Sequence, residues 1–298
     1  MERNNDLSKI IDLHVHSHIS DGSYSPEGLA QLAAQRGLAA FALTDHDSIL
    51  GCQEAAIAAE NRGIGFINGM ELSAEYAGHK VHIVCLGFDA HHPSFQLLYK
   101  KIRSIKEAKI PEMIDFVRER GVDISLEKVR PFAHGALDRY ALMRYMVSLQ
   151  MYERAQPLWD NYLNPAAEAL GIDVNITAEE ALPLIREAGG VTSLAHFHKN
   201  IGLKGLSRQE QEKAILHLHS MGLDGMERYY PNYTAEDEDF AAYMIEKYQL
   251  LATGGTDFHG TNRPGIELGT GEDGNMQVPW EYFQKIKSKT QQEFVQAV

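Results

Sequence analysis

The sequence predicts an α/β protein in which a mainly parallel sheet, barrel-like or doubly wound, is covered by helices. Short apolar segments alternate with helical patterns in the first and last thirds of the 298 residues, and helical patterns dominate the middle. This length allows one large domain, or one domain with an insertion. We expect a helical subdomain at residues 96–170, inserted into a sheet domain formed by residues 8–95 and 171–298.

The first third contains four expected strands and two expected helices. The apolar segment 10–16 forms the first strand, and the next segment has the signals of a helix: Ser25 as N-cap, Pro26 in the first turn and Gly37 as the C-terminal stop. The remaining segments continue the pattern. They are a strand at 38–46, a helix at 48–63, and strands at 65–76 and 79–89.

The middle and last thirds follow in order. Two long helical patterns make up the expected insertion, and strand–helix alternation then resumes until a final helix. The helical patterns of the insertion cover residues 94–121 and 138–163. The alternation covers 176–198, 212–230 and 240–260, and the last helix begins at 279.

Composition excludes several classes of function. The net charge is −13 and no long basic run occurs, so binding to extended nucleic-acid duplexes through counterion release is not expected. No apolar run approaches the roughly 20 residues that cross a bilayer, so no membrane partner is expected. The polar N-terminus lacks a signal-peptide core. Cys52 and Cys85 form neither a CxxC site nor a disulfide framework. We expect a cytoplasmic protein.

Residues that can bind metal ions follow the apolar segments throughout the chain. His14 and His16 alternate in the first strand, where a half-buried strand normally carries apolar side chains. In barrels and open parallel sheets, the carboxyl ends of the strands converge on one site. Nine side chains are therefore expected to meet there: His14, His16, Asp21, His46, Glu71, His82, His196, Asp257 and His259.

Such a cluster predicts bound divalent cations. Three carboxylates close together would repel one another and take up protons, and divalent ions reverse that cost. Imidazole and carboxylate ligands together suit Mn, Fe or Zn, and a carboxylate can bridge two ions. A single HxH or DxH pair would carry little weight, whereas six histidines and three acids at successive strand ends favour a metal centre.

The same residues resemble a known family. The segment DLHVHSHISDGSYSPEGLAQLAAQRGLAAFALTDHDSILG is similar to the opening of the PHP family, the polymerase and histidinol phosphatase phosphoesterases. GMELS, VHIVCLGF, LAHFH and GGTDFHG follow in that family's order. The resemblance implies a distorted (β/α)₇ TIM-like barrel with two or three divalent ions and an inserted helical subdomain.

The resemblance also implies how the ligands are shared. The first ion would be held by His14, His16, Glu71 and Asp257. The second would be held by Glu71, His82 and His196, with Glu71 bridging. The third would be held by Asp21, His46 and His259. The resemblance thus implies a positive site for phosphate within an acidic protein.

Within this family, the SDG turn followed by SPEGL is most similar to a bacterial branch of nucleoside 3′,5′-bisphosphate phosphatases and 5′–3′ exonucleases of short RNA. That similarity implies a small phosphorylated substrate, a nucleotide or the 5′ end of short RNA. Arg139 stands where the branch carries a phosphate-binding arginine, although its flanking residues differ. Phe197 replaces the usual proline after the histidine of LAHFH, and Lys199 supplies a basic residue. Arg263 is a third candidate for binding phosphate.

The expected chemistry is hydrolysis of a phosphomonoester by a hydroxide that bridges two metal ions. Glu71, His196 and Asp257 are the expected catalytic residues, with Asp257 or a histidine passing protons. Tyr229 and Tyr230 are expected to pack in the core rather than stack on a base. One alternative is a histidinol-phosphate-type phosphatase or another amidohydrolase-like metal hydrolase. Another is a non-catalytic PHP module that binds a partner.

Overall fold

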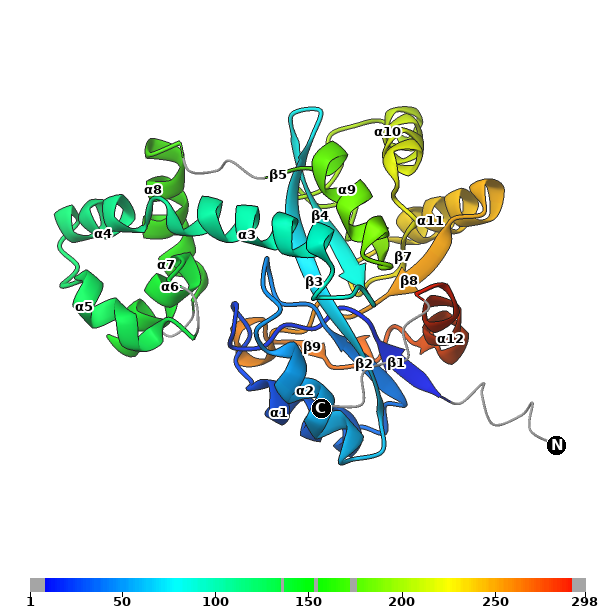
Figure 1. The fold of residues 1–298 in the computed structure, drawn as a ribbon, viewed down its shortest axis with the longest axis horizontal. Coiled ribbons are helices and arrows are strands. Elements are labelled where there is room, and N and C mark those ends of the chain that lie inside the picture. Colours follow the sequence, from blue (N-terminus) through cyan, green and yellow to red (C-terminus); the bar gives the residue numbers. More distant parts are fainter. Residues whose placement is uncertain (1–8, 135–136, 153–154, 172–175, 291–298) are drawn as a thin grey trace. The chain divides into compact units, whose positions relative to one another are not determined.

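The computed structural model describes residues 9–134, 137–152, 155–171 and 176–290. The chain divides into two compact units (Figure 1). The first combines Met1–Leu98 with Ile176–Val298, and the second is Tyr99–Asn175. We call them the barrel unit and the helical unit. The insertion expected at 96–170 corresponds in position to the helical unit.

A nine-stranded sheet forms the centre of the barrel unit, in the order β11-β1-β2-β3-β4-β6-β7-β8, with β5 paired to β3. The sheet closes between β1 and β8, because Leu13, just after β1, donates to the carbonyl of Gly254 in β8 at 3.2 Å and His16 donates to that of Phe258 at 2.9 Å. The expectation of a distorted TIM-like barrel is therefore confirmed. The strands are β1 (Ile10–Asp12), β2 (Ala40–Leu43), β3 (Gly65–Tyr76), β4 (His79–Leu86), β5 (Ile176–Thr177), β6 (Val191–Leu194), β7 (Gly225–Tyr229), β8 (Leu251–Gly254) and β11 (Val278–Pro279).

The pair β3 and β4 departs from strand–helix alternation. A two-residue turn, Ala77 and Gly78, joins them, with φ of 48° and 82°. Positive φ at both positions is the geometry of a tight hairpin, which only antiparallel strands can share. β4 therefore runs antiparallel to β3 and also to β6. Both strands are long and form the ribbon through the middle of the unit (Figure 1).

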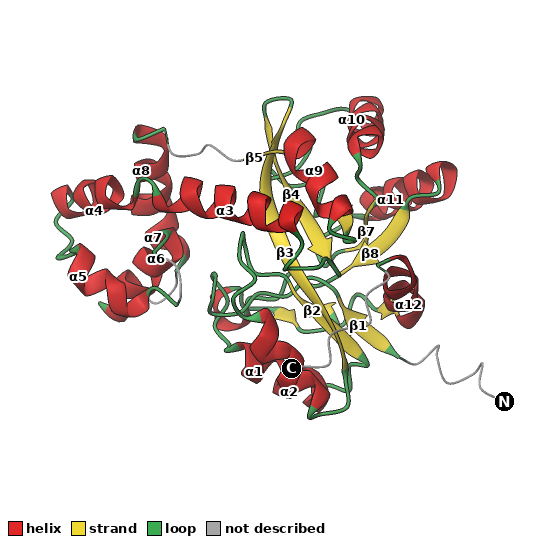
Figure 2. Ribbon diagram, in the orientation of Figure 1, coloured by secondary structure: helices red, strands yellow, loops and turns green. Residues whose placement is uncertain are grey.

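Helices lie outside the strands of the barrel unit (Figure 2). The first forms where its sequence signals predict, with the Ser25 side chain accepting from the N–H of Gly28 and Gly37 at a φ of 72° beyond its end. An apolar layer that includes Leu29, Phe41 and Ala55 packs the first two helices on the sheet. The helices are α1 (Pro26–Gln35), α2 (Cys52–Glu60), α9 (Ala178–Glu187), α10 (Arg208–Met221), α11 (Ala235–Tyr248) and α12 (Trp280–Lys289). The strands β9 (Ile266–Glu267) and β10 (Gly271–Glu272) form a separate pair.

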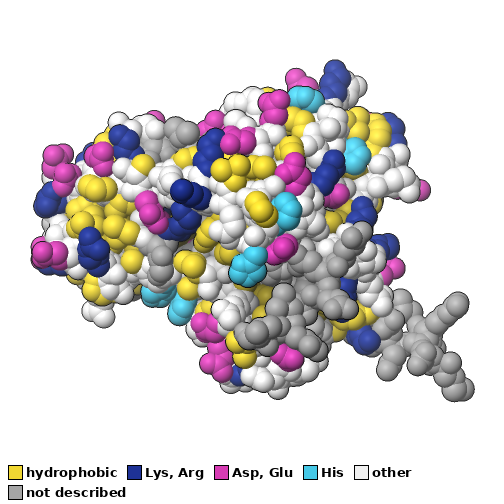
Figure 3. Space-filling view, viewed as in Figure 1, with side chains coloured by type: hydrophobic (Ala, Val, Ile, Leu, Met, Phe, Trp, Pro, Cys, Tyr) yellow, Lys and Arg dark blue, Asp and Glu magenta, His cyan; other side chains and the backbone are white. Residues whose placement is uncertain are grey.

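The helical unit has a hydrophobic core of its own, which includes Val117, Leu142 and Leu158, all fully buried. On the face visible in Figure 3, its apolar side chains lie among interspersed acidic and basic ones. Among the described residues, no helix has the length and apolar character to cross a membrane. The helices are α3 (Pro93–Glu107), which begins in the barrel unit, α4 (Ile110–Glu119), α5 (Leu126–Val129), α6 (Arg139–Ser148), α7 (Gln156–Leu158) and α8 (Asn164–Ala169).

Candidate metal centre

The HxH segment lies just beyond the end of β1. Regular strand pairing stops at Asp12, earlier than expected; the chain bends at Leu13, and an isolated bridge follows at Val15. Leu13 and Val15 join the apolar layers, whereas His14 and His16 are fully buried among the acids of the site. Both imidazoles point the same way, because the Nε2 atom of each lies 3.2 Å from the Glu71 carboxylate. The HxH spacing therefore presents two ring nitrogens to the barrel interior.

Glu71, fully buried in β3, lies at the centre of the cluster. Five imidazoles surround its carboxylate. Oε1 lies 3.2 Å from His14 Nε2, 2.8 Å from His82 Nδ1 and 3.0 Å from His196 Nε2, and Oε2 lies 3.2 Å from His16 Nε2 and 3.0 Å from His46 Nδ1. The Glu71 carboxylate thus contacts histidines that were expected to bind different metal ions, and a residue that bridges two ions requires such contacts.

The fold explains why residues so distant in sequence meet. The segments after β1, β2, β6 and β8 leave the carboxyl ends of parallel strands, which face one end of the barrel. His82 reaches the site from the other direction of the chain. Because β4 runs antiparallel to β3, the N-terminal half of β4, which contains His82, lies at that same end of the barrel. His82 pairs in register with Ser73 of β3, which shares a face with Glu71.

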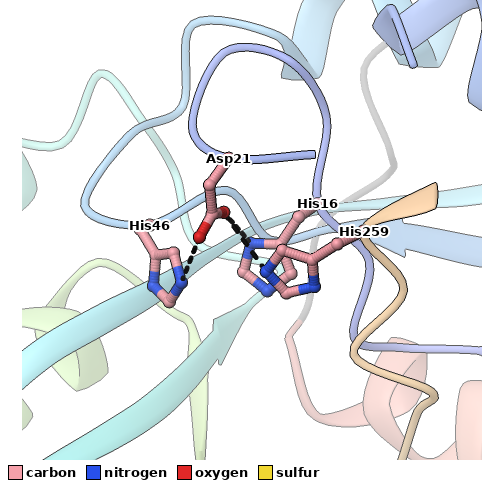
Figure 4. A group of neighbouring side chains, drawn as sticks. All are labelled: His16, Asp21, His46 and His259. Carbon is pink, nitrogen blue, oxygen red and sulfur yellow. Dashed lines mark ion pairs between the residues drawn. The ribbon is translucent and has the colours of Figure 1, made fainter. Parts of the chain in front are cut away.

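Asp21, in the loop that follows His16, contacts a second set of imidazoles (Figure 4). One carboxylate oxygen lies 3.2 Å from His259 Nε2 and 3.8 Å from His16 Nδ1. The other lies 3.7 Å from His46 Nε2. His16 and His46 therefore stand between the Asp21 carboxylate and the Glu71 carboxylate.

The ligand-capable atoms form three overlapping groups, within each of which all lie within 4.8 Å of one another. The structure thus brings all nine expected residues together. In the second group His46, rather than His196, stands with Glu71 and His82, although His196 also contacts Glu71. The groups are His14, His16, Glu71 and Asp257; His46, Glu71 and His82; and His16, Asp21, His46 and His259.

Asp257 links the imidazole cluster to cationic side chains. Its Oδ1 lies 3.2 Å from His16 Nε2. Its Oδ2 accepts from the Tyr230 hydroxyl at 2.7 Å and from Arg263 Nη1 at 2.6 Å, and Lys199 Nζ lies at 3.3 Å. Lys199 and Arg263 are partly exposed, so two of the three expected phosphate-binding cations stand between the buried cluster and solvent.

The electrostatic environment gives Glu71, Asp257 and His196 the protonation states of metal ligands, whereas around His14 and His16 the neighbouring carboxylates outweigh burial and raise the pKa of both imidazoles. Burial on its own would raise the pKa of Glu71, but the surrounding imidazoles, His82 first among them, hold it well below its ordinary value. Burial also opposes ionisation of Asp257, whose pKa is nevertheless held low by Lys199 and the neighbouring histidines. Burial lowers the pKa of His196 to about 3, so this imidazole is neutral at pH 7. Ionised carboxylates and neutral imidazoles are the forms that bind metal ions.

Several buried polar atoms of the cluster lack a hydrogen-bond partner among the described residues, although they lie within ion-pair distance of one another. Buried polar atoms are normally hydrogen-bonded, so such a group of exceptions calls for an explanation. A shared set of cations would satisfy them all, and nitrogen and carboxylate oxygen are suitable donors for Mn, Fe or Zn. The residues therefore fit the expected ions. These atoms are His14 Nε2, His16 Nε2, Asp21 Oδ1, Glu71 Oε2 and His82 Nδ1.

Two buried acids that sequence reasoning did not single out support the cluster. Glu227, in the middle of β7, accepts from His14 Nδ1 at 2.7 Å and from the backbone N–H of His196 at 2.7 Å. Asp45 accepts from the hydroxyls of Ser17 and Ser20, each at 2.7 Å, and so shapes the loop that leads to Asp21. The sequence feature that could have indicated Glu227 is its position as an acid within an expected strand segment, DGMERYY.

Arg139, Tyr229 and Tyr230 lie outside the group of nine residues. Arg139 is the first residue of α6 in the helical unit, with its guanidinium 5.5 Å from the centre of the Trp159 ring. It belongs to a different unit from the cluster. Tyr229 packs on the barrel core, as expected. Tyr230 is also buried, but its hydroxyl bonds to Asp257 and so reaches the site, which core packing alone does not describe.

The backbone is strained at two of the nine residues. His196 has a φ of 25° and Asp257 a φ of 53°, in the left-handed region that favours glycine. Such conformations cost on the order of 1–3 kcal/mol each and persist where the surrounding contacts hold them. The fold thus holds these two residues in unfavourable backbone conformations, which direct their side chains toward the cluster.

Comparisons with known proteins agree with this geometry. The PHP domain family matches residues 12–177. The chain is 31% identical to a 5′-3′ exoribonuclease of Haemophilus influenzae, over 85% of this chain and 91% of the relative. It is also 31% identical to a 3′,5′-nucleoside bisphosphate phosphatase of Chromobacterium violaceum, over 88% and 92%.

A solved structure is similar over nearly the whole chain. It is an amidohydrolase from Chromobacterium violaceum with bound sulfate and no metal, 29% identical, with a TM-score of 0.75 and coverage of 94% of this chain and 96% of that one. The family match spans more than half of the chain, and it includes the HxH segment, Glu71 and His82. With the gathered histidines and acids, these similarities show that the chain belongs to the PHP domain family.

Proposed function

We propose that this protein is a metal-dependent phosphoesterase that removes phosphate from a small phosphorylated metabolite. The substrate is a nucleotide such as a nucleoside 3′,5′-bisphosphate, or the 5′ end of short RNA. The observation that carries the proposal is the convergence of six imidazoles and three carboxylates at one end of the barrel. The relatives named for nucleotide and RNA phosphoester hydrolysis support the substrate class.

The nine residues hold two or three divalent ions of the Mn, Fe or Zn type, with Glu71 as the shared ligand. When bound, such ions lower the pKa of water toward neutrality and neutralise phosphate charge. The chain itself orients these ligands, because they come from six segments of the barrel and contact one another where those segments meet. It also excludes bulk water from the Glu71 carboxylate, which is fully buried.

The phosphate is bound by the cations next to Asp257. Arginine presents a planar pair of donors that matches phosphate oxygens, and lysine adds a mobile charge. Arg263 is held in place by Asp257 and by Asn232, whose side-chain oxygen it contacts at 2.8 Å. Lys199 bonds to the Tyr230 hydroxyl. Arg139 is proposed as a further phosphate contact on the resemblance of its segment to that of the relatives.

Proton transfer to the leaving oxygen falls to Asp257 or to an imidazole such as His196. One Asp257 oxygen faces the cluster and the other faces the partly exposed cations, so this residue lies beside both the metal ligands and the phosphate-binding side chains. We place the enzyme in the cytoplasm, in keeping with two cysteines that are both free thiols.

The test is a phosphate-release screen with Mn²⁺-loaded protein. Adenosine 3′,5′-bisphosphate and short 5′-phosphorylated RNA are compared with histidinol phosphate, a phosphodiester, an amide and a lactone. We expect turnover of the first two. In Arg263→Ala and Lys199→Ala variants we expect a higher KM with unchanged Mn²⁺ content, because these residues touch substrate rather than metal. Turnover of the amide or lactone alone would contradict the proposal.

A further inference from the structure

Glu227 makes two contacts that join residues of different metal groups. Glu227 is 1% exposed and lies in the middle of β7. Oε1 is 2.7 Å from His14 Nδ1, and Oε2 accepts from the backbone N–H of His196 at 2.7 Å. Through these contacts one carboxylate ties the segment after β1 to the segment after β6. We propose that Glu227 is a positioning residue that aims His14 and His196 at the metal ions, an inference that rests on the proposed function.

The contact to His14 decides which ring nitrogen can bind a metal ion. A carboxylate beside Nδ1 accepts a proton donated from that nitrogen, so Nδ1 keeps its hydrogen. Nε2 is then the nitrogen left to act as a ligand, and it faces Glu71 Oε1 at 3.2 Å and Asp257 Oδ1 at 3.5 Å. Carboxylate partners of this kind fix the orientation of metal-binding histidines and make them better donors.

The contact to His196 acts on the backbone. His196 has a φ of 25°, which a side-chain-bearing residue adopts only when its surroundings impose it. The hydrogen bond from its N–H to Glu227 is one such restraint, because it holds the strained residue at the end of β6. The ring of His196 then reaches Glu71, with Nε2 3.0 Å from Oε1. Loss of this hydrogen bond would release the ring from the cluster.

Both contacts require a hydrogen-bond acceptor at position 227. Variants that differ in the number of acceptor oxygens there test the proposal. Glu227→Gln has nearly the same shape but only one acceptor oxygen, whereas His14 Nδ1–H and His196 N–H are two donors. One of the two contacts must then become donor against donor. Glu227→Asp keeps both acceptors on a side chain shorter by one methylene.

Asp224→Asn is a matched control. Asp224 comes just before β7 and accepts from the backbone N–H of Thr192 in β6 at 2.9 Å, so it ties the same two strands. It does so at the opposite end of these strands, away from the nine residues. A change there affects the β6–β7 pairing without touching a metal ligand.

The experiment measures Mn²⁺ affinity and stoichiometry of the full chain by calorimetric titration and elemental analysis. We expect Glu227→Gln to bind Mn²⁺ about 10–100-fold more weakly than the unmodified protein. Asp224→Asn should bind it within about twofold, and Glu227→Asp more tightly than Glu227→Gln, since acceptor number decides the effect. In Zn²⁺-loaded protein, the ring N–H signal of His14 should move upfield in Glu227→Gln, because its carboxylate acceptor is gone.

The outcomes separate this inference from the proposed function. If the unmodified protein binds no Mn²⁺ or Zn²⁺, the metal centre itself is wrong and this inference falls with it. If the unmodified protein binds Mn²⁺ and Glu227→Gln binds it equally well, only the role of Glu227 is overturned. If Glu227→Asp and Glu227→Gln lose Mn²⁺ affinity equally, the packing of the side chain rather than its number of acceptor oxygens decides the affinity. That result would also overturn the role proposed for Glu227. Should Glu227→Gln fail to fold, the unmodified Zn²⁺-loaded protein carries the test: we expect the His14 ring hydrogen on Nδ1, and a hydrogen on Nε2 instead would overturn the role of Glu227.

Discussion

Glu71 illustrates how a single residue can organise a site. Its carboxylate lies within 3.2 Å of five imidazoles from four segments, and it has no solvent exposure. Removing one partner from a buried charged group leaves the others uncompensated, which is far more costly than losing an exposed ion pair. We therefore expect the site to be more sensitive to this residue than to any phosphate-binding cation.

The prediction at this scale concerns Glu71→Gln. The variant should retain the barrel fold but lose at least one bound Mn²⁺ and at least about 100-fold in kcat, since an amide is a poor bridging ligand. Circular dichroism, elemental analysis and phosphate release measure the three properties. Glu75→Gln, on the same strand and outside the nine residues, is the matched control and should behave like the unmodified protein. Normal activity in Glu71→Gln would refute the bridging role.

At the scale of elements, the loop between β1 and α1 depends on a buried acid from a different segment. Asp45, after β2, accepts from the N–H groups of Ser17 and Ser20 at 2.8 and 3.3 Å, and from both hydroxyls. These bonds shape the first part of the loop that carries Asp21. The loop is thus held by tertiary contacts rather than by regular secondary structure.

Asp45→Ala should therefore lower the free energy of unfolding by about 2–4 kcal/mol, because several buried donors lose their acceptor. It should also weaken the Mn²⁺ site that includes Asp21 more than the site that includes His14. Urea unfolding and stepwise Mn²⁺ titration measure the two effects. Asp224→Ala is the control, because it also deprives a backbone N–H, that of Thr192, of its carboxylate acceptor. It should lower the free energy of unfolding while leaving all Mn²⁺ sites intact. A normal Mn²⁺ titration in Asp45→Ala would show that the loop holds Asp21 without it.

At the scale of the whole molecule, metal binding and folding are coupled. The nine side chains lie close together only in the folded barrel, so ions that they bind stabilise the native state by mass action. At a free concentration 100-fold above Kd, one ion contributes about 2.7 kcal/mol. For a unit of this size that corresponds to a rise in Tm of about 5–10 °C.

Chelator-treated protein should therefore unfold at a lower temperature than protein with Mn²⁺, as measured by calorimetry. Mg²⁺ should give a smaller shift, because it prefers an all-oxygen shell. The Glu71→Gln variant should respond less to Mn²⁺ than the unmodified protein. Identical Tm values with chelator and with Mn²⁺ would contradict a metal centre that exists only in the folded state.

The sequence by itself determined the local elements and the membership of the cluster. Ser25, Pro26 and Gly37 mark the bounds of α1 because capping depends on neighbouring residues alone. The cluster was predictable because strand ends in a barrel converge, so polar residues after apolar segments must meet. The family resemblance rested on these same residues, and the family match confirms it.

The tertiary structure decided what depends on partners distant in sequence. The antiparallel direction of β4, which brings His82 to the site, follows from the turn at Ala77 and Gly78 and from pairing with β6. The role of Glu227 became visible only when closure of the barrel placed it beside His14 and His196. A residue's type and spacing reveal what it can bind. Its actual contacts are set by strand pairing across the whole sheet, which no local window of sequence contains.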